Sequence, residues 1–150
     1  MQRVTRATVT TGGRVTGRID RGLLVLLGVT GDDTAESAGK LATKVVGLRV
    51  FEDAQGKMND SLHAVGGAVL CVSQFTLYGD VRRGNRPSFD AAARPEVALP
   101  LYEAFCRGVE AEGIRCERGA FGEHMEVELV NDGPVTLVLD TAWLEQPRRA

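Results

Sequence analysis

Two strongly apolar runs constrain the fold of this 150-residue chain more than any other feature. They are residues 22–29 (GLLVLLGV) and residues 68–77, which begin AVLCV. The first run is continuous and shows no polar alternation, which is typical of a β-strand that is buried on both faces. The second run is also strongly apolar and predicts a second strand. Both runs are far shorter than the roughly 18 to 20 apolar residues of a membrane helix. We therefore expect the chain to fold around a buried sheet.

The remaining strands are predicted from β-branched residues and turn signals. Residues 3–10 and 14–19 are rich in Val and Thr and flank Gly12-Gly13, a pattern that indicates a β-hairpin. Similar but shorter stretches predict four more strands, at residues 48–51, 114–118, 125–130 and 135–140.

Two main helices are predicted between these strands. Apolar residues recur at helical spacing up to Gly47, behind a predicted capping box of Asp33 and Glu36. The second helix is predicted from about residue 95 to residue 112, where Pro100 indicates a kink or a later start. No repeat or linker is visible, so we expect one α+β domain over residues 1–150, with a loose tail after about residue 143.

Composition narrows the chemistry that this chain can perform. Hydrophobic residues make up 43% and charged residues 25%, which is ordinary for a soluble globular protein. The three cysteines, Cys71, Cys106 and Cys116, are odd in number and widely spaced, which indicates reduced thiols in a cytoplasmic protein. His63 and His124 have no metal-ligand spacing, so we expect neither a metal ion nor a cofactor.

The charge distribution is less simple than the net charge of −2. That value argues against a nucleic-acid partner, because phosphate affinity comes mostly from Lys and Arg. However, residues 3–21 carry five arginines and one aspartate, and residues 82–94 carry four arginines and one aspartate. Weak, local contact with a nucleic acid is therefore compatible with the sequence if the fold exposes these segments.

Polar residues interrupt the second apolar run at Ser73, Gln74 and Thr76. Buried polar groups without partners cost about 1–3 kcal/mol each, so these side chains need hydrogen bonds. They either satisfy neighbouring backbone or form a site at the end of the strand. No GxSxG elbow surrounds Ser73, and no His–Asp pair is arranged in a recognisable pattern to activate either hydroxyl.

A second segment, residues 131–136 (NDGPVT), lies between two predicted strands. Asp, Gly and Pro are turn formers, so a β-turn by itself explains this composition. A functional alternative exists because Gly133 lacks a Cβ, so its carbonyl can be pressed against a ligand. The bond before Pro134 can also reach the cis state at only about 0.5–1 kcal/mol.

Taken together, SQFTL at residues 73–77 and NDGPVT at residues 131–136 resemble the two signature motifs of the D-aminoacyl-tRNA deacylase family. The resemblance covers nearly the whole chain. Further segments that look like the family are QRV at 2–4, GLLVLLGV at 22–29, GKMN at 56–59, RPSF at 86–89 and FGxxM at 121–125, where Glu123 departs from the alanine usual in the family. The fold that this resemblance implies is an α+β domain with a barrel-like sheet and two main helices.

The activity that the resemblance implies is hydrolysis of the ester between a D-amino acid and tRNA, which proofreads the chirality of translation. Glycyl-tRNA is also an expected substrate, because glycine has no side chain to reject. The expected partners are the tRNA 3′ end and a second copy of the chain, with an active site at each subunit interface. The resemblance assigns the lining of the ester site to Ser73, Gln74, Phe75 and Thr76.

The resemblance also implies how the hand of the amino acid is read. Gly133 and Pro134 match a cis peptide that enters the pocket of the partner subunit. With amine and ester held fixed, a rigid carbonyl there overlaps an L side chain but meets only hydrogen in the D form. Phe121 and Met125 match residues that shape the adenosine end of the pocket, and Arg3 matches an arginine that fixes the Gly-Pro loop.

Two other functions remain open from the sequence. One is a catalytically silent RNA-binding dimer, which the absence of a conventional catalytic triad suggests. The other is a conventional hydrolase of small esters with Thr76 or Cys71 as the nucleophile. The resemblance instead favours main-chain groups near Phe75 that hold the reacting carbonyl, assisted by the ribose 2′-hydroxyl of the terminal adenosine.

Overall fold

The two apolar runs form the centre of the sheet in the computed structural model, which describes residues 1–148. Strand β3 (Gly22–Leu27) lies parallel to β6 (Ala68–Ser73), in register from Gly22 beside Ala68 to Leu27 beside Ser73. One residue of each strand is only partly buried, and the others are fully buried. The prediction that the first run forms a strand covered on both faces is confirmed for Gly22–Leu27, and the second run forms a buried strand as far as Ser73.

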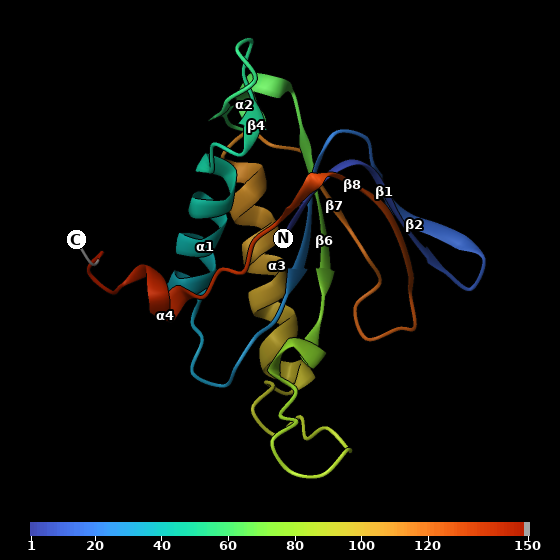
Figure 1. Ribbon diagram of the computed structural model, residues 1–150. Coiled ribbons are helices and arrows are strands. Elements are labelled where there is room, and N and C mark those ends of the chain that lie inside the picture. The colour runs from blue at the N-terminus through green and yellow to red at the C-terminus, as the bar shows by residue number, and fades with distance from the viewer. Residues whose placement is uncertain (149–150) are drawn as a thin grey trace.

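The outer strands wrap around this pair. The sheet runs in the order β2-β1-β3-β6-β7, and β8 lies off this path and pairs with β1 (Figure 1). The hairpin predicted at Gly12-Gly13 joins β1 and β2. The bounds of these strands are Gln2–Thr11 for β1, Arg14–Ile19 for β2, Cys116–Arg118 for β7 and Glu126–Thr136 for β8. A separate small sheet contains β4 (Phe51–Glu52) and β5 (Met58–Asp60).

Different elements cover the two faces of the central strands. The two main helices, α1 (Ala35–Gly47) and α3 (Pro95–Ala111), pack side by side on one face (Figure 1). Residues of β1 and β2, among them Val4, Val9 and Ile19, pack on Leu24 and Leu70 at the other face. Two short helices complete the fold, α2 (Leu62–Val65) and α4 (Thr141–Leu144). The predicted α+β class, with a barrel-like sheet and two main helices, is confirmed.

The first turn of α1 is capped differently from the prediction. Thr34 is the N-cap and Ser37 completes the capping box, so the predicted pair of Asp33 and Glu36 is wrong. The reason is that the Asp33 carboxylate accepts a hydrogen bond from the backbone N–H of Thr30 at 2.8 Å. That bond closes the turn before the helix and occupies the Asp33 carboxylate, so Thr34 caps the helix instead.

The second apolar run leaves the sheet earlier than predicted. Strand β6 ends at Ser73, and Phe75–Tyr78 form a short 3₁₀ helix, η1. The backbone N–H of Gln74 donates to the carbonyl of Leu27 at 2.8 Å, and there β3 also ends. Since no neighbouring strand continues beyond that point, the backbone pairs with itself in a helical turn.

The strands around the second motif also differ from the prediction. Residues 125–130 and 135–140 were expected to be two strands, but β8 is one strand up to Thr136, and residues 137–140 lie outside it. Strand β1 pairs with β8 on both sides of the motif, and shifts of register accommodate the intervening residues. The predicted strands at 48–51 and 114–118 are also shorter, beginning at Phe51 and Cys116.

The second main helix begins at Pro95 and passes through Pro100, so a later start is wrong. No helix within residues 1–148 is long and apolar enough to cross a membrane. The tail predicted to be loose after about residue 143 begins with the last turn of α4. Its final residues, 149–150, lie outside the described part of the chain.

Candidate active site

The first motif lies at the carboxyl end of β6, where the sheet gives way to η1. The side-chain amide of Gln74 donates a hydrogen bond to the hydroxyl of Thr76. Within residues 1–148, no histidine or carboxylate is hydrogen-bonded to that hydroxyl. Thr76 therefore has an amide beside it where a nucleophile would need a general base.

The main chain of η1 offers two unused donors. The first turn closes when the N–H of Leu77 donates to the carbonyl of Gln74 at 3.3 Å. The N–H groups of Phe75 and Thr76 precede that turn and have no acceptor within the described chain. Preorganised main-chain donors of this kind can stabilise the oxyanion of an ester-hydrolysis intermediate.

Close packing holds η1 in place. The ring of Phe75 lies edge-on to that of Phe89, with ring centroids 5.2 Å apart. A Cβ on Gly28 would lie 3.1 Å from the ring of Tyr78, and one on Gly79 would lie 3.0 Å from both Phe89 and the carbonyl of Thr76. These glycines allow the chain on either side to press against η1.

Asn131 organises the second motif. Its side-chain oxygen accepts a hydrogen bond from the N–H of Val135 at 2.8 Å, and its amide donates to the carbonyl of the same residue at 3.1 Å. Gly133 and Pro134, which are joined by a cis peptide bond, are exposed at the tip of the loop so closed. Gly133 has a φ of +142°, and a Cβ there would lie 2.9 Å from both the N and the Cγ2 of Val135.

Arg3 holds the same loop from the interior of the protein. It is 5% exposed and is the buried charged residue of the described chain. Its Nε donates to the main-chain carbonyl of Asp132 at 2.9 Å, and its Nη1 donates to the carbonyl of Val50 at 2.7 Å. The guanidinium thereby ties the Gly-Pro loop to the segment that precedes β4.

Phe121 and Met125 lie near the first motif. The N–H of Gly119 donates to the carbonyl of Cys71 in β6 at 3.1 Å, which brings the chain after β7 to the end of that strand. Met125 packs there, its sulfur accepting from the N–H of Ala120 at 3.3 Å. Phe121 is half-buried, and its ring centroid lies 5.8 Å from that of Tyr102 on α3.

The predicted site residues of the two motifs do not meet within one chain. Asn131 and Gly22, the residue at which β3 begins, both pair with the same residue of β1. Ser73 instead pairs with Leu27, the residue at which β3 ends. Five residues of strand span about 17 Å. Figure 1 shows η1 and the orange-red turn at the end of β8 at opposite ends of the central strands. Ser73 to Thr76 thus lie near Phe121 and Met125, but away from Gly133 and Pro134.

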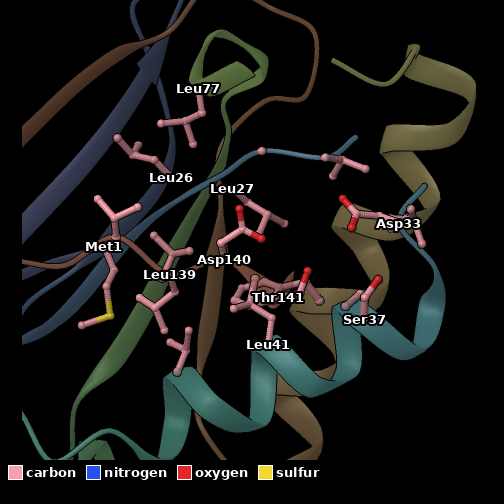
Figure 2. Close-up of a pocket in the computed structure, with 18 of the residues that line it drawn as sticks. Met1, Leu26, Leu27, Asp33, Ser37, Leu41, Leu77, Leu139, Asp140 and Thr141 are labelled. Atoms are coloured by element: carbon pink, nitrogen blue, oxygen red, sulfur yellow. The ribbon is translucent and has the colours of Figure 1, made fainter. Parts of the chain in front are cut away.

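A cavity of about 340 Å³ lies between β3, α1, η1 and residues 137–143, and sequence reasoning missed it (Figure 2). Its walls are mainly apolar, and burial raises the pKa of Tyr78 at its edge, with the Asp33 and Asp140 carboxylates adding to the shift. Leu77 and Thr136, the last residues of the two motifs, contribute to the lining, but none of the predicted site residues does. Residues on its walls include Leu26, Leu27, Leu41, Leu139, Ser37 and Thr141. Nothing in the sequence indicates this cavity, because its walls come from distant segments that each read as ordinary core.

The three free thiols are enclosed in the protein core. Cys71, Cys106 and Cys116 are all buried in the core between β6, β7 and α3. Burial raises the pKa of the Cys71 thiol, so this side chain is a neutral thiol at neutral pH. No group of three or more His, Cys, Asp or Glu side chains within residues 1–148 could hold a metal ion.

Comparison with known proteins decides the family. A family described as D-Tyr-tRNA(Tyr) deacylase matches residues 1–140. The chain belongs to this family. A relative from Koribacter versatilis (strain Ellin345), named D-aminoacyl-tRNA deacylase, is 64% identical over 141 residues, which cover 94% of this chain and 95% of the relative. A relative of the same name from Thermus aquaticus is 58% identical, covering 95% and 93% of the two chains.

Solved structures agree with the family in fold. One titled "c-Myc DNA Unwinding Element Binding Protein" is 42% identical with a TM-score of 0.85, and the match covers 93% of this chain and 95% of that one. Another, titled as a probable eukaryotic D-amino acid tRNA deacylase, has a TM-score of 0.77 over 89% of this chain and 92% of its own. It is 18% identical and therefore supports the fold alone. The resemblance seen in the two motifs is confirmed at the level of the family.

Proposed function

We propose that this protein is a single-domain D-aminoacyl-tRNA deacylase that hydrolyses the ester bond and releases the D-amino acid and tRNA. The observation that carries the proposal is family membership over nearly the whole chain, with a relative of this name at 64% identity. Proofreading of this kind acts on tRNA during translation, which takes place in the cytoplasm. The residues proposed to line the ester are Ser73, Gln74, Phe75 and Thr76.

The working enzyme is proposed to be a homodimer with an active site at each interface. Support comes from the separation of the two motifs, each of which is exposed at its own end of the sheet. A second copy would bring the partner subunit's Gly133 and the partner subunit's Pro134 to the Ser73–Thr76 segment of the first. Phe75 and Leu77 are each 57% exposed, and such apolar side chains suit an interface.

Within this site, chirality is proposed to be read by exclusion. The Gly133 carbonyl would occupy the space that an L side chain needs, while a D substrate presents only hydrogen there. The hydrogen bonds that Asn131 and Arg3 make around the loop support this role, because a carbonyl that excludes a side chain by overlap must be held in place. Glycine carries no side chain, so glycyl-tRNA is proposed to be hydrolysed as well.

The chemical step is proposed to use main-chain donors and no protein nucleophile. The free N–H groups of Phe75 and Thr76 would hold the oxygen that becomes negative as the ester carbonyl is attacked. Such a donor contributes about 3–4 kcal/mol of transition-state stabilisation in other hydrolases. The ribose 2′-hydroxyl would assist, with Phe121 and Met125 shaping the pocket for the terminal adenosine.

The deciding experiment is to incubate the purified protein with D-Tyr-tRNA, L-Tyr-tRNA and Gly-tRNA and to follow release of the amino acid. We expect D-Tyr-tRNA and Gly-tRNA to be hydrolysed and L-Tyr-tRNA to survive. Equal hydrolysis of both hands would contradict chiral proofreading. Tight tRNA binding with no turnover would instead favour the catalytically silent RNA-binding dimer.

Replacing Thr76 by alanine separates the proposed chemistry from a threonine hydrolase. The variant loses one neutral hydrogen bond, worth about 0.5–1.5 kcal/mol. We therefore expect the single-turnover rate on D-Tyr-tRNA to fall by no more than about tenfold. Complete loss of turnover in Thr76→Ala, with Thr76→Ser active, would identify Thr76 as the nucleophile.

A further inference from the structure

A loop rich in arginine projects from the candidate active site, and no step proposed above uses it. Residues 81–87 (VRRGNRP), here called the arginine arm, are all exposed. The two ends of the arm are joined, because the N–H of Asp80 donates to the carbonyl of Ser88 at 2.7 Å and the N–H of Ser88 donates back at 2.9 Å. The arm is therefore a closed loop with a fixed base.

The base of the arm is attached directly to the proposed ester site. Phe89, next to the base, packs on Phe75 with ring centroids 5.2 Å apart. Gly79, on the other side, lies so close to Phe89 and to the carbonyl of Thr76 that a Cβ would be 3.0 Å from each. In Figure 1 the arm is the yellow-green loop that extends beyond η1, away from the sheet.

The charges of the arm are not all equivalent. Arg82 pairs with both carboxylate oxygens of Asp80, at 2.7 to 3.1 Å, so its charge is compensated and it stabilises the base. Arg83 and Arg86 have no carboxylate within 4 Å among residues 1–148. Two uncompensated guanidinium groups therefore stand in solvent on one short loop beside the site.

We propose that Arg83 and Arg86 bind backbone phosphates of the substrate tRNA close to its 3′ end, an inference that rests on the proposed deacylase function. The four residue-to-residue steps from Asp80 to Gly84 can reach at most about 14 Å from the base. This distance takes the guanidinium groups past a terminal adenosine held at η1, toward the nucleotides that precede it. Arginine suits this task because its planar fork matches phosphate oxygens.

Proximity to the site distinguishes the arm from the other basic segment. The arginines of the β1–β2 hairpin, such as Arg14 and Arg18, are equally exposed. However, Figure 1 shows the tip of that hairpin on the far side of the sheet from η1. It thus supplies a matched control, since removing Arg14 and Arg18 changes the net charge by the same amount.

The test compares Arg83→Gln/Arg86→Gln with Arg14→Gln/Arg18→Gln on two substrates. One is D-Tyr-tRNA, and the other is 3′-O-(D-tyrosyl)adenosine, which carries the ester but no phosphate. For the arm variant on D-Tyr-tRNA in 50 mM salt, we expect kcat/KM to fall at least about tenfold, mainly through KM. On the adenosine ester, both variants are expected to match the wild type.

Salt dependence gives a second readout. The slope of log(kcat/KM) against log[salt] is negative, and each lost phosphate contact makes it less negative by about 0.7 to 0.9. The slope of the arm variant should therefore be less negative than that of the wild type by about 1.4 to 1.8. An unchanged slope, an equal loss in the hairpin variant, or a loss on the adenosine ester would each overturn the proposal. A wild-type protein that hydrolyses neither substrate would instead contradict the proposed function itself.

Discussion

Gly133→Ala is expected to lower kcat/KM for D-Tyr-tRNA about 10²-fold and to reduce the preference for D over L. The added Cβ would lie 2.9 Å from two atoms of Val135, and the φ of +142° strongly disfavours any residue with a side chain. The loop must shift to relieve this contact, and a misplacement of about 1 Å in a positioning group costs about 10²-fold. Single-turnover deacylation of both hands of Tyr-tRNA measures the two effects.

Gly56→Ala is the control for the backbone cost of this substitution. Gly56 also has a positive φ, of +75°, but nothing lies within 4 Å of an added Cβ. It lies between β4 and β5, outside both motifs. We expect a loss of stability of about 1–3 kcal/mol with normal deacylation. A Gly133→Ala variant that behaves like Gly56→Ala would show that the Gly133 carbonyl has no part in selectivity.

Arg3→Met is expected to destabilise the protein by about 3 kcal/mol and to weaken chiral rejection. The methionine keeps an apolar stem but leaves the carbonyls of Val50 and Asp132 without their charged donor. For a protein of this size, such a loss lowers the melting temperature by roughly 6–12 °C. Without this hydrogen bond the loop can be displaced by an L side chain, so we also expect the ratio of D to L hydrolysis to fall about tenfold or more.

Two further variants separate the contacts of Arg3. Asp132→Asn removes an ion pair at 3.7 Å whose carboxylate is 42% exposed, but it keeps the main-chain carbonyl. Such pairs contribute about 0–1 kcal/mol, so we expect a melting temperature close to that of the wild type. Arg3→Lys keeps the charge but cannot donate in two directions from a planar fork, and we expect it to resemble Arg3→Met. A fully stable and selective Arg3→Lys would contradict the role of the fork.

Much of the fold could be predicted because its signals are local. The hairpin at Gly12-Gly13 and the two central strands depend on residues within about ten positions of each other. The cap of α1 was misplaced by one residue because Asp33 and Thr34 are both good caps. Only the hydrogen bond from Thr30 to Asp33, which depends on the path of the preceding turn, decides between them.

The candidate site was predictable where it is contiguous in sequence. Ser73 to Thr76 and residues 131–136 could be recognised because each motif is an unbroken segment. The cavity beside η1 could not, since its walls join Met1, α1 and residues 137–143. Arg3 on its own reads as a surface arginine, and its contact with Asp132 spans 129 positions.

Local signals were enough to predict the buried strands, the main helices and the two motifs, because periodicity and residue chemistry act over short stretches of chain. The ends of those strands depend on pairing between distant segments, since an apolar run leaves the sheet when its neighbour stops pairing, as β6 does at Ser73. The tertiary structure also decided that the two motifs lie at opposite ends of the sheet. That separation follows from the long-range register of β1 with β3 and β8, which no local pattern specifies.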